Sequence, residues 1–307
     1  MELVRFFEGV RTPFWDTVVG LITRLGEETV GVIILCMFFW CISKRIAYGI
    51  GIAFFLSGLT VQGMKIWFRI ERPWIIDPSL NPTPGALEYA TGYSFPSGHT
   101  QSAASLYGAL GAQVKDKVLM IVCLIIPMLV AFSRVYLGVH TLNDVAASLV
   151  ISAFFIWLTV NVILDKSDTV NKKRELIVAL FITLYAVAAV ILATVLYTNG
   201  TIELHNVLDC VKAAGAAIGF AVGMFIERVY IDFSVKSKNI LWHIIKVILG
   251  VVGVFAIMEG LKPLIGTGFA PDMIRYFLMT FWIIALYPLI IKRFFTVKED
   301  AATQPEQ

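Results

Sequence analysis

Residues 118–137 read VLMIVCLIIPMLVAFSRVYL, a run that is apolar almost throughout and carries a single arginine near its end. A helix of about 20 apolar residues is long enough to cross the hydrocarbon core of a bilayer. The whole chain has the same character, because 58% of its 307 residues are hydrophobic, 15% are charged and the mean hydropathy is +0.80. Soluble globular proteins of this length carry more charge. The sequence therefore predicts an integral membrane protein.

The predicted fold class is all-α, a polytopic membrane helical bundle with about five spans in a front core and about four behind it. The segment 96–113 is short and rich in glycine and serine, and it is included because its neighbours require it. The net charge of +3 gives no reason to expect a nucleic acid partner, and no oligomeric state is indicated. The predicted spans are residues 27–43, 48–68, 96–113, 118–137, 142–164, 176–197, 207–229, 240–261 and 273–292.

Basic residues follow every second predicted span. Cytoplasmic loops carry an excess of lysine and arginine, so this side is predicted to be cytoplasmic. Arg69, Arg72 and Arg134 fall on the opposite side, against the tendency, and therefore indicate a site for an anion there. The basic clusters are Lys44 and Arg45; Lys115 and Lys117; Lys166, Lys172, Lys173 and Arg174; Arg228, Lys236 and Lys238; and Lys292, Arg293 and Lys298.

The chain divides into five regions by composition. Its first residues are amphipathic and lack the short apolar core of a signal peptide, and Thr12-Pro13 predicts two short helices on the membrane surface. All chemical motifs lie in the front half. The regions are 1–26, an amphipathic interfacial segment; 27–164, a catalytic membrane core; 165–175, a cytoplasmic linker; 176–297, a membrane region of unknown role; and 298–307, a polar tail.

The first polar motif is SRVYLGVHTLND, residues 133–144. A histidine with a carboxylate four residues further on, here His140 and Asp144, can be held in one tautomer. Its other ring nitrogen is then free to attack an electrophile. Arg134 suits an oxyanion, because its planar fork of N–H donors binds phosphate or carboxylate in two places at once. Alone, this motif is only suggestive.

The second motif is KIWFRIERP, residues 65–73. Lys65 and Arg72 are seven residues apart, which on a helix is about two turns, so both side chains are predicted to reach one point. Two long basic side chains near the end of a span are also common simply because they extend to the interface. The motif therefore gains its meaning from the others.

The third motif is YSFPSGHTQS, residues 93–102. Pro96 is predicted in the first turn of a helix, where Ser97 and Gly98 would offer free backbone N–H groups at the positive end. Such a helix start is a natural cradle for phosphate, and His99 follows within reach of it. A plain junction between loop and helix would also account for this motif on its own.

Taken together, K-x6-RP, PSGH and SR-x5-H-x3-D, in this order and on one side of the membrane, resemble the type 2 phosphatidic acid phosphatase superfamily. That superfamily shares its site with vanadium haloperoxidases and bacterial acid phosphatases. The resemblance covers residues 27–164, and every fixed position matches. The matching residues are Lys65, Arg72, Pro73, Pro96, Ser97, Gly98, His99, Ser133, Arg134, His140 and Asp144.

The resemblance implies a role for each motif residue. His140 is expected to be the nucleophile that forms a phosphohistidine, Asp144 to orient its ring, and His99 to protonate the leaving alkoxide. The expected ligands of the phosphoryl oxygens are Lys65, Arg72, Ser97, Gly98 and Arg134. Ser133 is expected to support the site. No metal or cofactor is implied, and the four histidines are not accompanied by a cluster of carboxylates.

The expected activity is metal-independent hydrolysis of a lipid phosphate or diphosphate monoester. Phosphatidate, lysophosphatidate, phosphatidylglycerophosphate and polyprenyl diphosphate are the candidate substrates, with membrane lipids as the surroundings. The expected location is a bacterial plasma membrane with the site on the extracytoplasmic side. Two alternatives remain. The site could transfer the phosphoryl group to an acceptor or hydrolyse a soluble phosphate, or the chain could be a lipid transporter, although no inverted repeat is visible.

Overall fold

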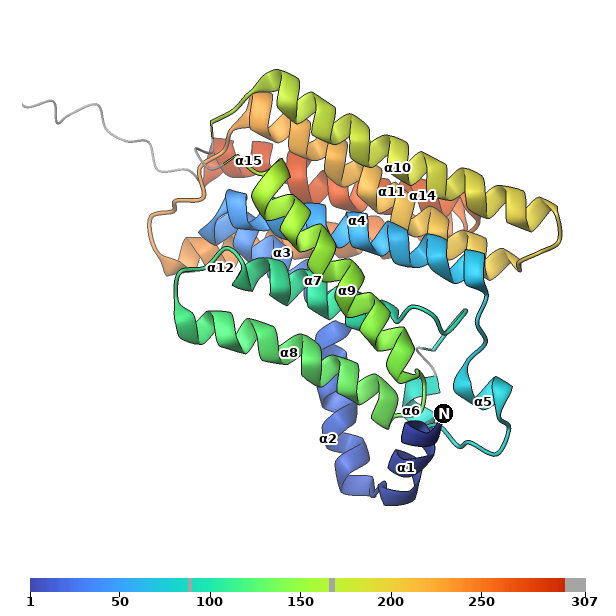
Figure 1. Ribbon diagram of the computed structural model, residues 1–307. Coiled ribbons are helices and arrows are strands. Elements are labelled where there is room, and N and C mark those ends of the chain that lie inside the picture. Colours follow the sequence, from blue (N-terminus) through green and yellow to red (C-terminus); the bar gives the residue numbers. More distant parts are fainter. Residues whose placement is uncertain (88–89, 166–168, 296–307) are drawn as a thin grey trace, which may run out of the picture.

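The structure is a computed structural model that describes residues 1–87, 90–165 and 169–295. Lys166, Lys298 and the polar tail 298–307 lie outside the described residues. Within them the protein is helical and contains no strand (Figure 1). The all-α prediction is confirmed.

The long helices are preceded by a short N-terminal pair and separated by single-turn helices. Five of the long helices end in or contain a wider π-helical turn, whose bounds follow the helix it continues. The bounds are α1 Glu2–Val10; α2 Pro13–Thr23; a 3₁₀ turn Arg24–Gly26; α3 Glu28–Met37 and Phe38–Ile42; α4 Lys44–Phe68; α5 Pro73–Ile76; α6 Pro84–Leu87; α7 Gly98–Gly111; α8 Lys117–Tyr136; α9 Leu142–Leu158 and Thr159–Ile163; α10 Lys172–Thr198; α11 Leu204–Ile226 and Glu227–Ile231; α12 Ile240–Phe255 and Ala256–Gly260; α13 Lys262–Ile265; α14 Phe269–Phe281 and Trp282–Leu286; and α15 Tyr287–Phe294.

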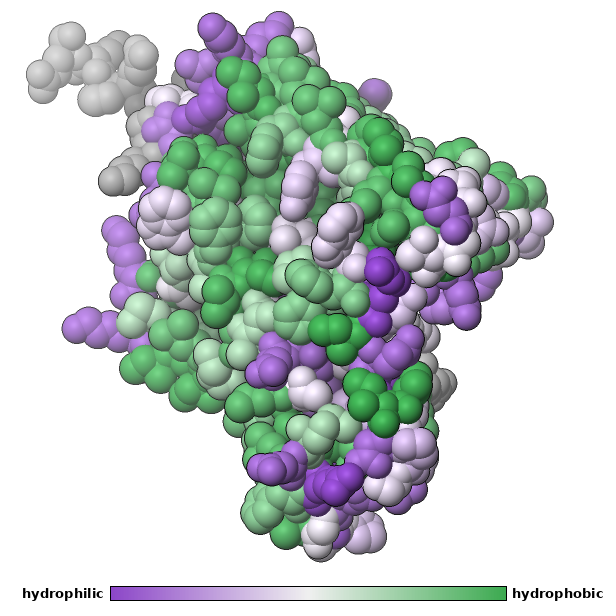
Figure 2. Space-filling view, turned by 45° about the vertical axis from the view of Figure 1, so that its right-hand side comes forward, coloured by the Kyte–Doolittle hydropathy of each residue, from purple (hydrophilic) through white to green (hydrophobic). Residues whose placement is uncertain are grey.

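Seven of the nine predicted spans correspond to helices that are long and apolar enough to cross a membrane. Figure 2 shows hydrophobic side chains over the broad middle of one face, with hydrophilic residues gathered at the upper left and left edge and toward the right-hand side and the bottom of the view. The protein is therefore an integral membrane protein. The seven helices are Lys44–Ile76, Lys117–Tyr136, Leu142–Ile163, Lys172–Thr198, Leu204–Ile231, Ile240–Ile265 and Phe269–Phe294.

The predicted span 27–43 is the α3 segment Glu28–Ile42, which follows Pro13–Gly26 at a bend of 52°. The predicted pair of short N-terminal helices is confirmed. α1 and α2 are separate, and Thr12 caps α2 by accepting a hydrogen bond from the backbone N–H of Trp15. That this segment lies on the membrane surface stays a prediction.

The predicted span 96–113 is α7, which has 14 residues and is shorter than a full crossing. It lies inside the bundle, between α4, α8 and α9 (Figure 1). Its polar side chains are buried and bonded to each other and to its neighbours. The Ser57 and Ser105 hydroxyls lie 2.7 Å apart, and the Gln101 amide donates to Ser57 at 2.8 Å. An interior helix can be rich in serine because neighbouring helices supply the partners that lipid cannot.

α4 joins the two halves of the bundle, since it packs against α7 and α9 on one side and α10 and α11 on the other. In the rear half, α11 packs closely on α14. A Cβ atom at Gly215 or Gly219 would lie 2.5 or 2.2 Å from the carbonyl oxygens of Met273 and Phe277. Small residues at helix contacts let two backbones approach closely, so α11 and α14 form a closely packed pair within the rear half.

The predicted linker 165–175 is partly helical, because α10 begins at Lys172. The Asn171 side chain caps this helix by accepting the backbone N–H groups of Lys173 and Arg174, which moves the helix start ahead of the predicted span. Residues 166–168 lie outside the described residues.

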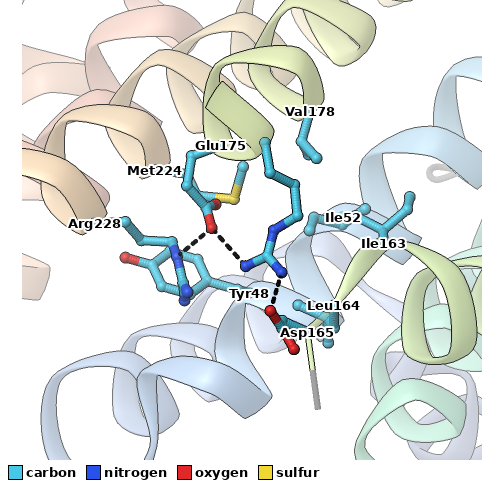
Figure 3. A pocket seen from close by; sticks show the side chains of 10 residues that line it. Tyr48, Ile52, Ile163, Leu164, Asp165, Glu175, Val178, Met224 and Arg228 are labelled. Carbon is cyan, nitrogen blue, oxygen red and sulfur yellow. Dashed lines mark hydrogen bonds and ion pairs between the residues drawn. The ribbon is translucent and has the colours of Figure 1, made fainter. Parts of the chain in front are cut away.

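Ion pairs connect residues 165–175 to α11 of the rear half (Figure 3). The Arg174 guanidinium bonds Asp165 at 2.5 Å and Glu175 at 2.9 Å, and Arg228 of α11 approaches Glu175 at 3.1 Å. Nearby, Lys44 at the start of α4 pairs with Glu227 at 3.0 Å. The basic ends of α4, α10 and α11 therefore meet at one end of the bundle, as the alternation of spans predicts.

Candidate active site

The second and third motifs meet at the opposite end of α4. The Lys65 ammonium lies in the last turn of α4 and donates to the backbone oxygen of Tyr93 at 2.7 Å. Arg72 donates to the carbonyls of Gly92 and Thr91 at 3.0 and 2.7 Å. Both cations are buried. The segment Thr91–Tyr93 is thus held by the two basic side chains that the sequence predicts to act together.

The local structure differs from the prediction that Lys65 and Arg72 share a helix face. α4 ends at Phe68, and Arg69 adopts a left-handed conformation with φ of 52°. Arg72 is extended and precedes α5, which begins at Pro73. A proline lacks the N–H that a helix interior needs, so it fits the first turn of α5. The two side chains converge through a turn in the chain instead of two helical turns.

His140 lies just before α9 and Asp144 lies in the first turn of that helix, inside the site. The His140 Nδ1 atom is 3.4 Å from Asp144 Oδ2, and each of the two residues is only 2% exposed. Asp144 is the third helical residue of α9 and forms a capping box with Thr141, whose backbone N–H donates to Oδ2 at 2.7 Å. The box fixes the carboxylate, and the carboxylate faces the imidazole.

Arg72 defines which nitrogen of His140 is free. Its Nη1 atom lies 2.8 Å from His140 Nε2. A guanidinium can only donate hydrogen bonds, so Nε2 acts as the acceptor and the ring proton is assigned to Nδ1, toward Asp144. The imidazole therefore points its unprotonated nitrogen at the cluster of cations.

Burial lowers the pKa of His140 well below its ordinary value, and the positive charges of Arg72, Arg134 and Lys65 lower it further. His140 lies between α8 and α9, in the turn that joins them. The lowered pKa favours the neutral imidazole, whose Nε2 lone pair accepts the hydrogen bond from Arg72.

The third motif begins α7 two residues later than predicted. Pro96 precedes the helix, and Ser97 is the N-cap, accepting from the backbone N–H of Thr100 at 3.4 Å. The Ser97 N–H is taken by the Asp144 carbonyl at 3.2 Å. Among the described residues, no acceptor takes the N–H groups of Gly98 or His99. A side chain at Gly98 would meet open space. The free N–H groups are therefore those of Gly98 and His99, one residue later than the predicted pair of Ser97 and Gly98.

Arg134 brings the first motif to the same place. It is 1% exposed, its Nη1 atom donates to the Thr23 hydroxyl at 2.9 Å, and its Nε atom has no hydrogen-bond partner within the described part of the chain. Arg134 and His99 line a cavity of about 220 Å³. An unpartnered buried guanidinium N–H beside a cavity is a donor ready for an anionic ligand.

Two residues of this site have no place in the sequence prediction. Ser94 is buried, donates to Asp144 Oδ2 at 2.7 Å and lies 3.5 Å from His140 Nδ1. Thr23 comes from the N-terminal segment and holds Arg134. Ser94 is inside the quoted motif YSFPSGHTQS but is not one of its matching positions. Nothing in the sequence links Thr23 to a residue more than one hundred positions away.

The loop from Trp74 to Tyr93 supplies part of the cavity wall. Thr83, Gly85 and Ala86 line it. Ser133, expected to support the site, is buried and donates to its own helix at the Val130 carbonyl. Residues 88–89 lie outside the described residues.

The arrangement combines a neutral histidine, an orienting carboxylate, a second histidine and three buried cations. Such a set can bind a phosphoryl group and attack it. In the described part of the chain, no group of three histidine, cysteine or acidic residues could hold a metal ion. Metal independence itself stays a prediction.

Comparison with known families agrees with this site. Residues 45–168 match the PAP2 superfamily, and residues 211–299 match the description "PAP2 superfamily phosphatase, transmembrane extension". These two matches together cover more than half of the chain. The protein belongs to the PAP2 superfamily, the type 2 phosphatidic acid phosphatases, and the resemblance drawn from its motifs is confirmed. It is a PAP2-family membrane phosphatase, and hence a phosphoric ester hydrolase.

Two individual relatives share between a quarter and a third of their aligned residues with this chain. The chain is similar to Phosphatidylglycerophosphatase B of Bacillus subtilis (strain 168), with 28% identity over 152 residues, or 44% of this chain and 69% of the relative. It is also similar to the solved structure of a transmembrane PAP2-type phosphatidylglycerolphosphate phosphatase from Bacillus subtilis. That similarity has 27% identity and a TM-score of 0.44, and covers 52% of this chain and 81% of the other.

Proposed function

We propose that this phosphatase hydrolyses lipid phosphate or diphosphate monoesters, without a metal, through a phosphohistidine on His140. The single observation that carries the proposal is the alignment of His140. Its Nδ1 faces Asp144 at 3.4 Å, and its Nε2 faces Arg72 at 2.8 Å. One nitrogen is thereby oriented by a carboxylate, and the other is directed at the place where the cations would hold a phosphoryl group.

In the first step, the Nε2 lone pair attacks phosphorus and the bond from phosphorus to the lipid oxygen breaks. His99 gives its proton to that leaving oxygen, so the lipid departs as an alcohol or a phosphomonoester. The imidazole ring becomes positively charged while it carries the phosphoryl group, and the negative charge of Asp144 favours that state. The negative charge of the bound phosphate favours the protonated form of His99.

In the second step, water attacks the phosphorus and the phosphorus–nitrogen bond breaks, so that His140 regains its lone pair. His99, now neutral, accepts the proton that the water loses. Lys65, Arg72 and Arg134, with Ser97 and the N–H groups that begin α7, bind the equatorial oxygens throughout. Fixed positive charge of this kind provides most of the catalysis in phosphoryl transfer.

The proposed substrate is a lipid already in the bilayer. The site lies at the end of α4 opposite the basic clusters, beside the connections α4–α5 and α8–α9. If the basic clusters are cytoplasmic, the site opens on the extracytoplasmic side, in a bacterial plasma membrane. The relative's name, Phosphatidylglycerophosphatase B, makes phosphatidylglycerophosphate the first substrate to test, with phosphatidate and polyprenyl diphosphate beside it.

We further assign the catalytic core to residues 27–164 and the linker to residues 165–175. The remaining membrane region, residues 176–297, packs against α4 and contains most of the matched transmembrane extension. This region contains two ion pairs, one between Asp209 and Lys212 at 3.2 Å and one between Asp272 and Arg275.

The test is phosphate release by purified protein in detergent, with EDTA in excess, from phosphatidylglycerophosphate, phosphatidate and undecaprenyl diphosphate. His140→Ala is expected to abolish release from every lipid because it removes the attacking atom. His243→Ala is the matched control, since that histidine lies near the start of α12, just after the basic cluster at Lys236 and Lys238 and so at the end of the bundle opposite the motifs. Turnover that persists in His140→Ala, or that is lost with EDTA, would contradict the mechanism.

Phosphoryl transfer is the alternative that the same site permits, because an alcohol could replace water in the second step. Adding glycerol or another alcohol and measuring its phosphate ester beside free phosphate separates the two outcomes. A soluble substrate is tested by running sugar phosphates in the same assay. A transporter would move lipid between leaflets of a vesicle in the His140→Ala variant, and we expect no such movement.

A further inference from the structure

The cavity beside His99 has a wall built from the N-terminal segment, which lies outside the residues matched to the PAP2 superfamily. α2 crosses α8 and packs against it, and the turn that follows α2 packs against the start of α7 (Figure 1). At this turn, a Cβ atom on Gly26 would lie 2.6 Å from the His99 carbonyl oxygen. The segment is thus in direct contact with two groups of the site, Arg134 through Thr23 and His99 through Gly26.

The position of the cavity relative to the reacting groups identifies its occupant. His99 and Arg134 line it, while His140, Lys65 and Arg72 do not. In phosphoryl transfer the attacking and leaving atoms lie roughly in line on opposite sides of phosphorus. A cavity that touches the proposed acid His99, and not the proposed nucleophile His140, lies on the side of the leaving group. It therefore holds the part of the lipid that departs.

The polar groups of this wall indicate the chemistry of that part. Arg24 lines the cavity, and no hydrogen bond or ion pair within the described residues engages its side chain. Asp16 and Glu27 line the same wall, and Asp16 accepts a hydrogen bond from the Tyr136 hydroxyl at 3.1 Å. Leu21, Ala86 and Leu137 give the wall apolar surface as well, which suits the rest of a lipid. Arg24 is an exposed, uncommitted cation of this wall, and it suits a group that carries its own negative charge because a guanidinium can bind phosphate in two places at once.

We propose that Arg24 binds a second phosphate, located in the leaving group of the substrate. This inference rests on the proposed function and narrows the set of proposed substrates. Phosphatidylglycerophosphate leaves as a lipid with an internal phosphodiester, and a polyprenyl diphosphate leaves as a lipid monophosphate. Phosphatidate leaves as a neutral diacylglycerol and offers Arg24 nothing to bind. The preferred substrates are accordingly lipids with two phosphates.

The experiment compares Arg24→Gln with the full-length wild-type protein on three lipids in the same detergent: phosphatidylglycerophosphate, phosphatidate with the same acyl chains, and undecaprenyl diphosphate. For the two-phosphate lipid that the enzyme prefers, kcat/KM is expected to fall by about 10- to 100-fold, the range typical of a lost hydrogen bond to a charged group. For phosphatidate it is expected to change by less than about 2-fold. Whichever two-phosphate lipid loses activity identifies the source of the second phosphate.

Two further variants test whether the effect of Arg24→Gln comes from the positive charge at this position and not from the loss of any surface charge. Arg24→Lys keeps the positive charge and is expected to retain most of the activity that Arg24→Gln loses. Lys262→Gln removes one exposed positive charge at the start of α13, outside the cavity lining, and is expected to behave as wild type. An equal loss on all three lipids, or no loss on any, overturns the role of Arg24. Wild-type protein that hydrolyses none of the lipids overturns the proposed function instead, and the inference with it.

Discussion

Asp144 has two separable roles, and Asp144→Asn is expected to remove one and preserve the other. Its Oδ2 atom accepts from the Thr141 N–H and the Ser94 hydroxyl, each at 2.7 Å, and faces His140 Nδ1 at 3.4 Å. The carbonyl oxygen of an asparagine can keep the position of Oδ2, while its amide group takes the place of Oδ1. The cap of α9 then remains, and only the negative charge is lost.

The size of the effect follows from the distance to His140. At 3.4 Å and an effective dielectric constant of about 20, two unit charges attract by about 5 kcal/mol. In the transition state the ring carries only part of its final charge, so about half of this is a reasonable expectation. Since about 1.4 kcal/mol corresponds to a factor of ten in rate, kcat should fall by about 10²-fold in Asp144→Asn.

Asp144→Ala is the informative partner variant. It leaves the Ser94 hydroxyl and the Thr141 N–H without their acceptor, and each buried unsatisfied group costs about 1–3 kcal/mol of folding free energy. Phosphate release gives kcat, and the midpoint of thermal unfolding in the same detergent gives stability. We expect Asp144→Asn to lose activity with little change in the midpoint, and Asp144→Ala to lose both. An asparagine variant within about 3-fold of the wild-type kcat would refute the role of the charge.

Three further predictions concern other parts of the site. Because the pKa of His140 is held well below its usual value of about 6.5, NMR of ring-labelled histidine should show this ring still neutral at pH values where an ordinary histidine is protonated. The unfolded chain binds this proton more readily, so folding stability falls as the pH drops below about 6.5. Gly26→Ala should lower kcat by about tenfold or more because its Cβ meets the His99 backbone, whereas Gly9→Ala, which meets nothing within 4 Å, should not. Thr23→Val should raise KM by about tenfold for all lipids alike, since Arg134 loses its hydroxyl partner, and Thr23→Ser should restore it.

The sequence is sufficient for the fold class and for the approximate bounds of most helices, because apolar runs longer than 18 residues have few alternatives. It is weaker at α7, where buried serines satisfy one another across helices and the apolar run is short. It is wrong about how Lys65 and Arg72 converge, since the left-handed turn at Arg69 breaks the helix between them. Residue spacing measures distance along a regular element and loses that meaning once the element ends.

The motif residues could be named from the sequence because three short patterns carry them, yet the partners that hold them in place could not. Thr23 acts on Arg134 from the N-terminal segment, and Ser94 acts on Asp144 across the loop. Each is a single hydroxyl whose importance comes from a distant contact. Threonine and serine are common in membrane helices and loops, so neither residue type indicates such a contact before the chain is folded.

The segment Thr91–Tyr93 explains why the rear helices belong to the same unit as the site. Its carbonyls face Arg72 and Lys65, and its other side rests on the N-terminal part of α11, where Tyr93 packs in the cluster that includes Val207. Gly92 has φ of 63°, and a Cβ atom there would lie 3.1 Å from the side-chain oxygen of Asn206. The carbonyls of Thr91–Tyr93 can hold the two buried cations only if the backbone of this loop is itself fixed in place by packing. α11 provides that support from outside the motifs, so the phosphate-binding geometry proposed for the front half depends on packing from the rear half.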